Sequence, residues 1–473
     1  MIGSYPMVHE NTQPFYDLAR IYSKALAGRR PTKKDLQTLL TSSRFSSLEH
    51  LAIPLVLDSL RNNGPSIDLL AELLDLLWSA GMDMNDVSAR LAHLSPANPR
   101  IRSLSKKFLD FRPVTGVHSI IHVAFYLSGD GNLGDRILPS AVGRAITPSE
   151  SGIERKHVHQ RFTADEIAGL GADHHVVVGG GGLILPDTRP NSRSGWQWNI
   201  SDDDLRALAG RVGSISLFSV GVNLFSASEQ LSRRAHRSLN VLAEVATVLG
   251  IRNHGSIARL MQILPQEYHG KISYCPCPTV LGFDGNCSVE FKNSLDARNI
   301  GINIAYDRSD RRFRNQDAFE SQLVEFCREM VARGTRISVL AHLKRDEAIA
   351  QALQRAEVAH TLEPLYALPI ARVKSILREL DLVVAMRGHA QMIPFGEGIP
   401  FVTLNSHPKT VYFAQDAGLE DLVVDVNSPS VSADLIEACN HLVSEWPKYR
   451  MILPERRRLM SQAIDETKDR IFG

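Results

Sequence analysis

The residues best suited to chemistry in this sequence are Arg387 and His389. They directly follow an apolar run, Leu382 to Met386, that is typical of a buried parallel strand. A second apolar run, Phe401 to Leu404, comes after room for one short helix. In such a strand–helix–strand unit, ligands bind at the carboxyl ends of the strands. A fixed cation, a titratable imidazole and the free N–H groups of a helix start together suit a small anion.

Two further cations stand at comparable positions. Arg252 lies where a short predicted strand gives way to a helix, a place that suits an arginine clamp for carboxylate or phosphate. Lys409 follows Pro408 near the same edge as Arg387, and it either adds positive potential for a phosphate or is a surface lysine. A loop at 307–314 is dense in arginine, and it is interpreted either as a solvated loop or as an anion site.

Two glycine-rich stretches follow predicted strands in the first half of the sequence. The loop at 128–135 contains Asn132 and Asp135 and opens a predicted helix, which lets backbone amides approach an anion. It matches neither Gly-x-Gly-x-x-Gly nor a Walker loop, so a turn made for packing is an equal alternative. The run Gly179 to Gly182 removes side chains where the backbone approaches a ligand or the first loop.

A polar segment at 189–199 contains Trp196 and Trp198, half of the four tryptophans of the chain. Indoles exposed in a loop can stack on sugar faces, and both residues are therefore candidates for binding an acceptor. The alternative, with equal weight, is that one or both cover the edge of the core.

Composition bounds the class of protein. A chain of 473 residues is too long for one ordinary core, and its formal net charge of +1 gives no bulk attraction to nucleic acid. Five cysteines, an odd number, fit reduced thiols in a cytosolic protein. The first residues lack signal-peptide features, and no apolar run approaches the ~18 residues of a membrane span. We expect a cytoplasmic protein, with peripheral association at the inner face of a membrane as a further option.

The alternation of strands and helices predicts an α/β protein with two doubly wound, Rossmann-like domains facing a cleft. The predicted division is a small all-α region at 1–113, a first domain at 114–288, and a second domain at 289–473 that includes the C-terminal helices. The strand-end loops of both domains, with Arg252 on one side and Arg387, His389 and Lys409 on the other, would line the cleft.

Five blocks in order resemble the polysaccharide pyruvyl transferase family, from about Val117 to the C-terminus. The blocks are Gly131-Asn-Leu-Gly-Asp135, Gly179-Gly-Gly-Gly-Leu-Ile184, Ser219-Val-Gly-Val222, Ile251-Arg252 with Ser256, and Arg387-Gly-His389 through Lys409. The resemblance implies the two-domain GT-B-like fold of one large glycosyltransferase group. It also implies transfer of an enolpyruvyl-derived unit from phosphoenolpyruvate to two sugar hydroxyls, which forms a cyclic ketal on a bacterial-type cell-surface polysaccharide, exopolysaccharide or precursor.

By this resemblance Arg387 and His389 would hold the donor, and Arg252 would also contact it. Gly388 and Lys409 are further candidates for donor binding. The family usually has leucine where Gly388 stands and an acidic residue where Asn253 stands. His389 is our hypothesis for the residue that moves protons, because imidazole titrates near neutrality. The alternative is a histidine at the start of a helix that is satisfied by packing. Asp135 would orient or deprotonate the acceptor hydroxyl, and a helix cap is the alternative role for it. The residues expected to contact the acceptor are Asn132, Trp196 and Trp198.

The expected partners are phosphoenolpyruvate and a sugar or oligosaccharide acceptor, lipid-linked ones included, and not nucleic acid. No cofactor is expected, and no spacing of His or carboxylate residues predicts a metal site. A second hypothesis is a glycosyltransferase with a nucleotide-sugar donor, in which Glu397 would be the carboxylate near the donor. A third is a non-catalytic relative that binds glycan or a partner enzyme, which the departure at Gly388 leaves open.

Overall fold

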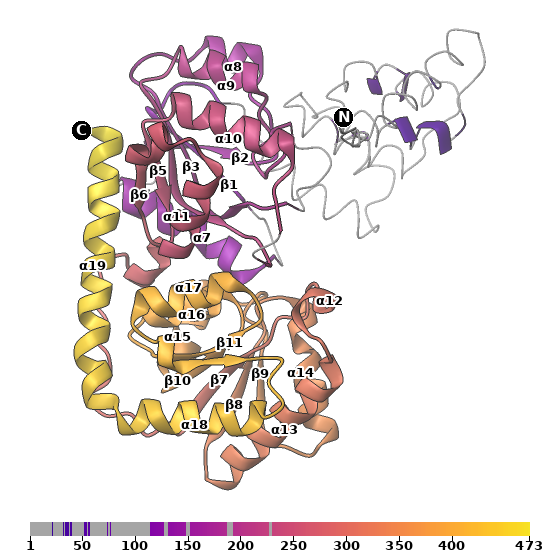
Figure 1. The fold of residues 1–473 in the computed structure, drawn as a ribbon, viewed down its shortest axis with the longest axis vertical. Coiled ribbons are helices and arrows are strands. Elements are labelled where there is room, and N and C mark those ends of the chain that lie inside the picture. Colours follow the sequence, from indigo (N-terminus) through magenta and orange to yellow (C-terminus); the bar gives the residue numbers. More distant parts are fainter. Residues whose placement is uncertain are drawn as a thin grey trace, which may run out of the picture.

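The computed structural model describes residues 114–126, 131–147, 152–186, 193–226 and 229–473, together with isolated positions between 21 and 76 (Figure 1). The predicted all-α region at 1–113 lies outside the described residues except for those positions, most of which are helical.

The first domain contains a six-stranded sheet, within the described ranges, in the order β2-β1-β3-β4-β5-β6. Every neighbouring pair of strands in it is parallel. The strands are β1 (Ile120–Ala124), β2 (Ile153–His157), β3 (His175–Ile184), β4 (Ser214–Val222), β5 (Val248–Ile251) and β6 (Ile272–Tyr274). The α-helices of this domain are α7 (Leu133–Ile146), α8 (Ala164–Ala168), α9 (Asp202–Ala209), α10 (Arg233–Val245) and α11 (His254–Ile263).

The second domain repeats the plan with the order β12-β11-β10-β7-β8-β9, again parallel throughout. Counted from β7, this is the 3-2-1-4-5-6 order of the Rossmann fold. The strands are β7 (Asn299–Asn303), β8 (Arg336–Leu340), β9 (Thr361–Glu363), β10 (Leu382–Ala385), β11 (Phe401–Asn405) and β12 (Val423–Asp425). The helices are α12 (Ser309–Arg312), α13 (Gln316–Ala332), α14 (Ala348–Arg355), α15 (Ile370–Arg378), α16 (Gly388–Gly396), α17 (Pro408–Ala417), α18 (Val431–Ser444) and α19 (Trp446–Phe472).

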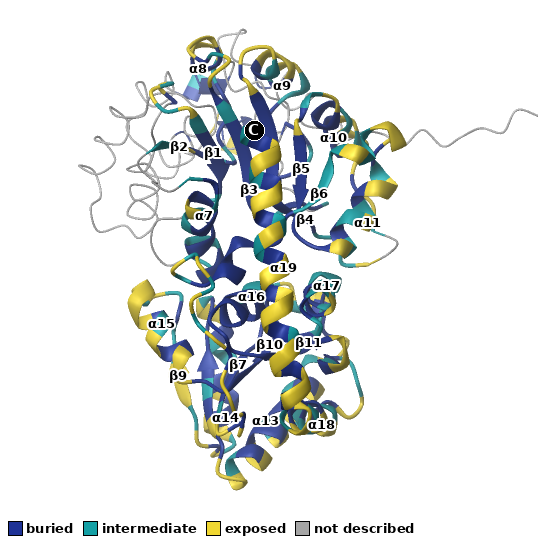
Figure 2. Cartoon of the chain, turned by 90° about the vertical axis from the view of Figure 1, so that its left-hand side faces the viewer, coloured by how far each residue is buried: buried dark blue, intermediate teal, exposed yellow. Residues whose placement is uncertain are grey.

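Burial follows the pattern expected of parallel sheets that are covered on both faces. Strands β4 and β10 are buried at every position, which is why they are almost wholly apolar or small in sequence. Figure 2 shows the buried strands at the centre of each domain and exposed residues on the outer sides of the helices. The expectation of two doubly wound α/β domains is confirmed.

The last helix, α19, joins the two domains (Figure 1). In its final turns Thr467 Oγ1 lies 3.2 Å from the carbonyl oxygen of Tyr274 and 3.2 Å from Ser273 Oγ, both in β6. Nearer its middle, Arg457 donates to the carbonyl oxygen of Gly396 at the end of α16, at 3.2 Å. The C-terminal helices were assigned from sequence to the second domain alone, but α19 packs against both domains.

Contacts between the domains bring the carboxyl edges of the two sheets toward each other. The backbone N–H of Leu133, at the start of α7, donates to the carbonyl oxygen of His342 after β8, at 3.1 Å. On another side, His254 Nδ1 lies 2.8 Å from Asp416 Oδ1 of α17. None of the described helices combines the length and the apolarity that crossing a membrane requires.

Candidate active site between the domains

Helices α7 and α11 of the first domain, and α16 and α17 of the second, begin at these facing edges. Three of the four have a capped first turn: the side chains of Asn132, Asn253 and His407 each accept a hydrogen bond from a backbone N–H. The residue before α16, Arg387, makes no such cap. The N-terminal turn of α16 therefore keeps amide groups that an anion can bind.

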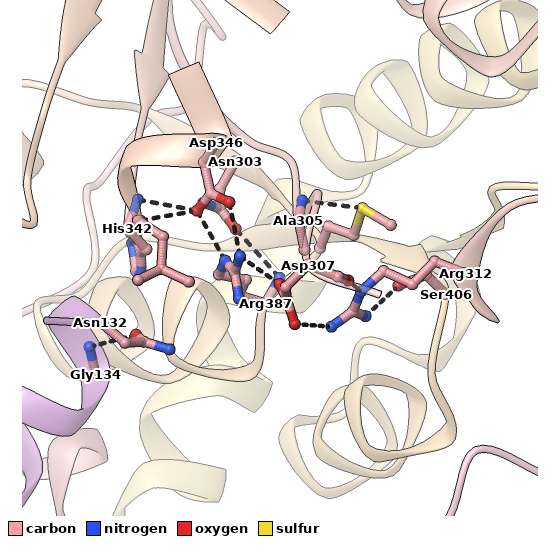
Figure 3. Close-up of polar contacts among 12 residues, drawn as sticks. Asn132, Gly134, Asn303, Ala305, Asp307, Arg312, His342, Asp346, Arg387 and Ser406 are labelled. Atoms are coloured by element: carbon pink, nitrogen blue, oxygen red, sulfur yellow. Dashed lines mark hydrogen bonds and ion pairs between the residues drawn. The ribbon is translucent and has the colours of Figure 1, made fainter. Parts of the chain in front are cut away.

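Arg387 is held in one orientation by two carboxylates (Figure 3). Its Nε and Nη2 donate to the two oxygens of Asp346, at 2.8 and 2.6 Å. Nη2 also lies 2.5 Å from Asp307 Oδ1, and the backbone N–H of Arg387 donates to Asn303 Oδ1 at 3.2 Å. Arg387 is only 8% exposed, so its guanidinium has little freedom to turn.

The carboxylate of Asp307 also bonds Arg312, which is itself 5% exposed. Arg312 Nη2 lies 3.2 Å from Asp307 Oδ2, and Arg312 Nη1 donates to Ser406 Oγ at 2.9 Å. These two arginines hold the pKa of Asp307 well below its usual range, against the opposing effect of burial. Arg312, from the arginine-dense loop, therefore belongs to a buried ion-pair network and not to a solvated loop.

Arg252 reaches the same place from the first domain. It is 5% exposed, its Nη2 donates to Asn223 Oδ1 at 2.8 Å, and its Nε has no hydrogen-bond partner among the described residues. Asn223 and Arg252 directly follow neighbouring strands, β4 and β5, which explains their proximity. A buried guanidinium with an unused N–H is a site for an oxyanion.

His389 lies against the start of α7 in the other domain. A β-carbon placed on Gly134 would overlap its ring, and its Nε2 is 3.7 Å from the Sγ of Cys277. Burial, with the nearby charges of Arg252 and Lys409, lowers the pKa of His389 to about 3. The imidazole is therefore neutral in the ligand-free protein at pH 7, and the expectation that it titrates near neutrality is not met without a bound anion.

Asp135 and Lys409 have pKa values moved toward neutrality. Desolvation raises the pKa of Asp135 to about 6, although Lys409, Arg387 and Arg252 oppose it. The same cause, with repulsion from Arg252 and Arg312, lowers the pKa of Lys409 to about 7. Both residues, like His389, are of intermediate exposure.

The structure thus brings together five of the predicted site residues, namely Arg252, Arg387, His389, Lys409 and Asp135. Gly388 is the first residue of α16. Asn132 caps α7, and its Oδ1 accepts the N–H of Gly134 at 3.0 Å, so that oxygen serves the helix.

The structure contradicts the prediction that Trp196 and Trp198 present their rings to a sugar. Both are 0% exposed and pack in the core of the first domain, their ring centroids 6.0 Å apart. Trp196 Nε1 donates to Ser238 Oγ of α10 at 3.2 Å. Burial of two large indole rings stabilises the core, even though the residues around them in the sequence are polar. The alternative role, covering the core, is therefore the one observed.

Four residues of the site were missed from the sequence: Asn223, Cys277, Asp307 and Asp346. Asn223 and Asp307 come one and four residues after the core strands β4 and β7, a position that could have identified them. No pattern in the sequence singles out Asp346, and Cys277 was considered only among the reduced thiols. Burial raises the pKa of the Cys277 thiol, whose Sγ lies 3.1 Å from Thr279 Oγ1.

With this geometry in place, comparison with known families is decisive. The profile of the polysaccharide pyruvyl transferase family matches residues 66–408. The chain belongs to the polysaccharide pyruvyl transferase family. The match begins within the N-terminal region that sequence analysis placed outside the resemblance, and it ends one residue before Lys409. No curated protein matches the sequence.

Two solved structures that resemble the chain are a sugar transferase by its name and a protein solved with UDP and glucose. A Thermobaculum terrenum O-GlcNAc transferase has 12% identity, covers 98% of this chain and 97% of its own, and superposes with a TM-score of 0.40. Anabaena HepE, solved with UDP and glucose, has 11% identity, covers 75% and 98%, and has a TM-score of 0.42. The assignment of the fold rests on the strand orders and not on these distant similarities.

Proposed function

We propose that this family member transfers a pyruvyl unit from phosphoenolpyruvate to two hydroxyls of a sugar in a polysaccharide or its precursor, forming a ketal. The observation that carries the proposal is the convergence of Arg252, Lys409 and Arg387 beside the uncapped start of α16. Phosphoenolpyruvate has a carboxylate and a phosphate, and charge-assisted bonds from arginine suit both groups.

The ion-pair network divides the work among the cations. Arg387 is neutralised by Asp346 and Asp307, so it offers directed hydrogen bonds more than net charge. Arg252 and Lys409 supply the positive charge that attracts the donor, as their mutual repulsion in the ligand-free site indicates. A dianion placed between them would relieve that repulsion.

The reaction forms two C–O bonds from the sugar hydroxyls to the central carbon of the donor and breaks its bond to the phosphate oxygen. Of the two hydroxyl protons removed, one is added to the methylene carbon and the other leaves with inorganic phosphate. Asp135, with a pKa of about 6, is suited to accept a hydroxyl proton near neutral pH. His389 is neutral in the free site because Arg252 and Lys409 depress its pKa. A bound dianion offsets those charges, so His389 can hold a proton when the donor is present and pass it to the methylene carbon.

The glycosyltransferase hypothesis is weakened by the position of Glu397. Its Oε1 accepts from the backbone N–H of Phe283 at 2.7 Å, and its Oε2 lies 3.1 Å from Arg378 Nε. At 2% exposed, this carboxylate holds the end of α16 and is not available to a ribose. The hypothesis of a non-catalytic relative is not favoured by Gly388, since a β-carbon there meets only Met392 Cε, at 3.9 Å.

The test is release of inorganic phosphate from phosphoenolpyruvate by purified protein, with and without a panel of cell-wall and capsule oligosaccharides. The proposal predicts release that depends on both substrates, together with a ketal product detected by mass spectrometry. Absence of release with every acceptor, alongside hydrolysis of a nucleotide sugar, would favour the glycosyltransferase hypothesis instead.

A further inference from the structure

We propose that Asp346 is a positioning residue for the donor site. Its buried carboxylate accepts a bidentate hydrogen bond from Nε and Nη2 of Arg387, and this orients the guanidinium so that Nη1 faces the bound anion. The inference rests on the proposed function for the identity of the anion, and on geometry alone for the orientation of Arg387.

Both oxygens of Asp346 are fully engaged (Figure 3). Oδ2 accepts from the backbone N–H groups of His342 and Leu343, at 3.2 and 3.0 Å, and from Arg387 Nε, at 2.8 Å. Oδ1 accepts from Arg387 Nη2 at 2.6 Å. The side chain of Asp346 is 0% exposed, so it cannot touch a substrate and acts only through Arg387.

The consequence for Arg387 follows from counting its donors. A guanidinium has five N–H groups, of which Nε has one and each Nη has two. The N–H groups of Nε and Nη2 face Asp346 and Asp307. Nη1 has no hydrogen-bond partner among the described residues, and it is the part of Arg387 left for a ligand. Without the bidentate bond to Asp346, the guanidinium could rotate about its side-chain bonds and direct other N–H groups toward the ligand.

A structural role alone would predict a different pattern of effects, and the chain offers a matched control. Asp381, 9% exposed, also accepts two backbone N–H groups, those of Arg298 and Asn299 at 2.8 and 3.0 Å, and one cation, Lys292 at 2.5 Å. It lies at the amino ends of β7 and β10, at the edge of the sheet away from the site. The variants Asp346→Asn and Asp381→Asn thus remove similar bonds at opposite edges of one sheet.

The experiment compares these two variants with the wild type in two assays. The first is the rate at which phenylglyoxal labels Arg387, followed by peptide mass mapping, which needs no ligand. The second is steady-state kinetics with phosphoenolpyruvate. We expect Asp346→Asn to accelerate labelling of Arg387 and to raise KM for phosphoenolpyruvate about 10- to 100-fold, with a much smaller change in kcat. Asp381→Asn should lower the melting temperature and leave both readouts as in the wild type.

Labelling and KM of Asp346→Asn equal to those of the wild type would overturn the proposal. Accelerated labelling in a protein whose wild type does not turn over phosphoenolpyruvate would support the positioning role and remove the proposed function. If Asp346→Asn does not fold, Arg387→Lys replaces it, because lysine keeps the positive charge but cannot make the bidentate hydrogen bond to Asp346. A KM for phosphoenolpyruvate within twofold of the wild type in that variant would also overturn the proposal.

Discussion

The imidazole of His389 lies so close to the α-carbon of Gly134 that a β-carbon on Gly134 would overlap its ring. The two residues belong to different domains, at the N-terminal turns of α16 and α7. The side chain proposed to move protons is therefore placed by the backbone of the opposite domain. The relative position of the two domains sets the geometry of the site.

Replacing Gly134 with alanine should displace His389 and lower kcat. We expect a loss of about 100-fold, since small misplacements of a reacting group have effects of this size. Because Gly134 lies within the first turn of α7, alanine should not weaken the helix itself. Turnover by Gly134→Ala equal to that of the wild type, measured as phosphate release, would show that His389 is not a required group.

Gly388→Ala is the complementary change, and it should preserve activity. Gly388 starts α16, and a β-carbon there would have Met392 Cε at 3.9 Å as its nearest neighbour. Alanine should therefore stabilise the folded protein by about 0.4–1 kcal/mol, by reducing the entropy of the unfolded chain. Thermal unfolding should show a higher melting temperature. A large loss of kcat in this variant would mean that the site requires glycine at position 388.

The pH profile should follow Asp135 and Lys409. Below its pKa of about 6, Asp135 is protonated and cannot accept a hydroxyl proton, so kcat/KM should rise as pH increases through this value. Above its pKa of about 7, Lys409 loses the charge that attracts the donor, so kcat/KM should fall. A narrow bell between these limbs is expected for the wild type.

The two limbs can be assigned by substitution. Lys409→Arg keeps its charge at all these pH values and should remove the alkaline fall, because arginine is not deprotonated in proteins. Asp135→Asn should lose most activity at every pH. An alkaline limb unchanged in Lys409→Arg would assign that limb to another group.

Trp196→Phe should separate stability from acceptor recognition. The indole is buried and donates to Ser238 Oγ, so the smaller ring leaves space and an unpaired hydroxyl. We expect the free energy of unfolding to fall by about 1–3 kcal/mol. KM for the acceptor should not change in the folded protein, and a selective rise in that KM at unchanged stability would restore a role in binding sugar.

Strands and helices could be predicted from the sequence where their residue pattern is distinctive. Apolar runs such as Leu382 to Met386, which contains β10, identified the central strands, because strands buried on both faces are apolar throughout. The edge strand β2, with the sequence Ile-Glu-Arg-Lys-His, was missed because an edge strand can be polar and short. The short strand predicted before Arg252 is β5, which begins at Val248, with two residues between it and the end of α10 at Val245.

The site was predictable where a cation directly follows a strand, as Arg252 and Arg387 do. The other site residues were not predictable. Asp346, the partner of Arg387, lies in a short turn after β8, and Cys277, the neighbour of His389, follows β6; the positions of both depend on tertiary packing. The depressed pKa of His389 was also not predictable, since it arises from burial and from charges that both domains contribute.

Equilibrium binding of phosphoenolpyruvate, measured by isothermal titration calorimetry, tests the central claim most directly. The wild type should bind one equivalent, and Arg252→Ala should bind at least about 10-fold more weakly, because a buried guanidinium that donates to an anion is lost. UDP-sugars should give no heat of binding. Tight binding of a UDP-sugar, or phosphoenolpyruvate affinity that is equal in the wild type and Arg252→Ala, would contradict a donor site between the two domains.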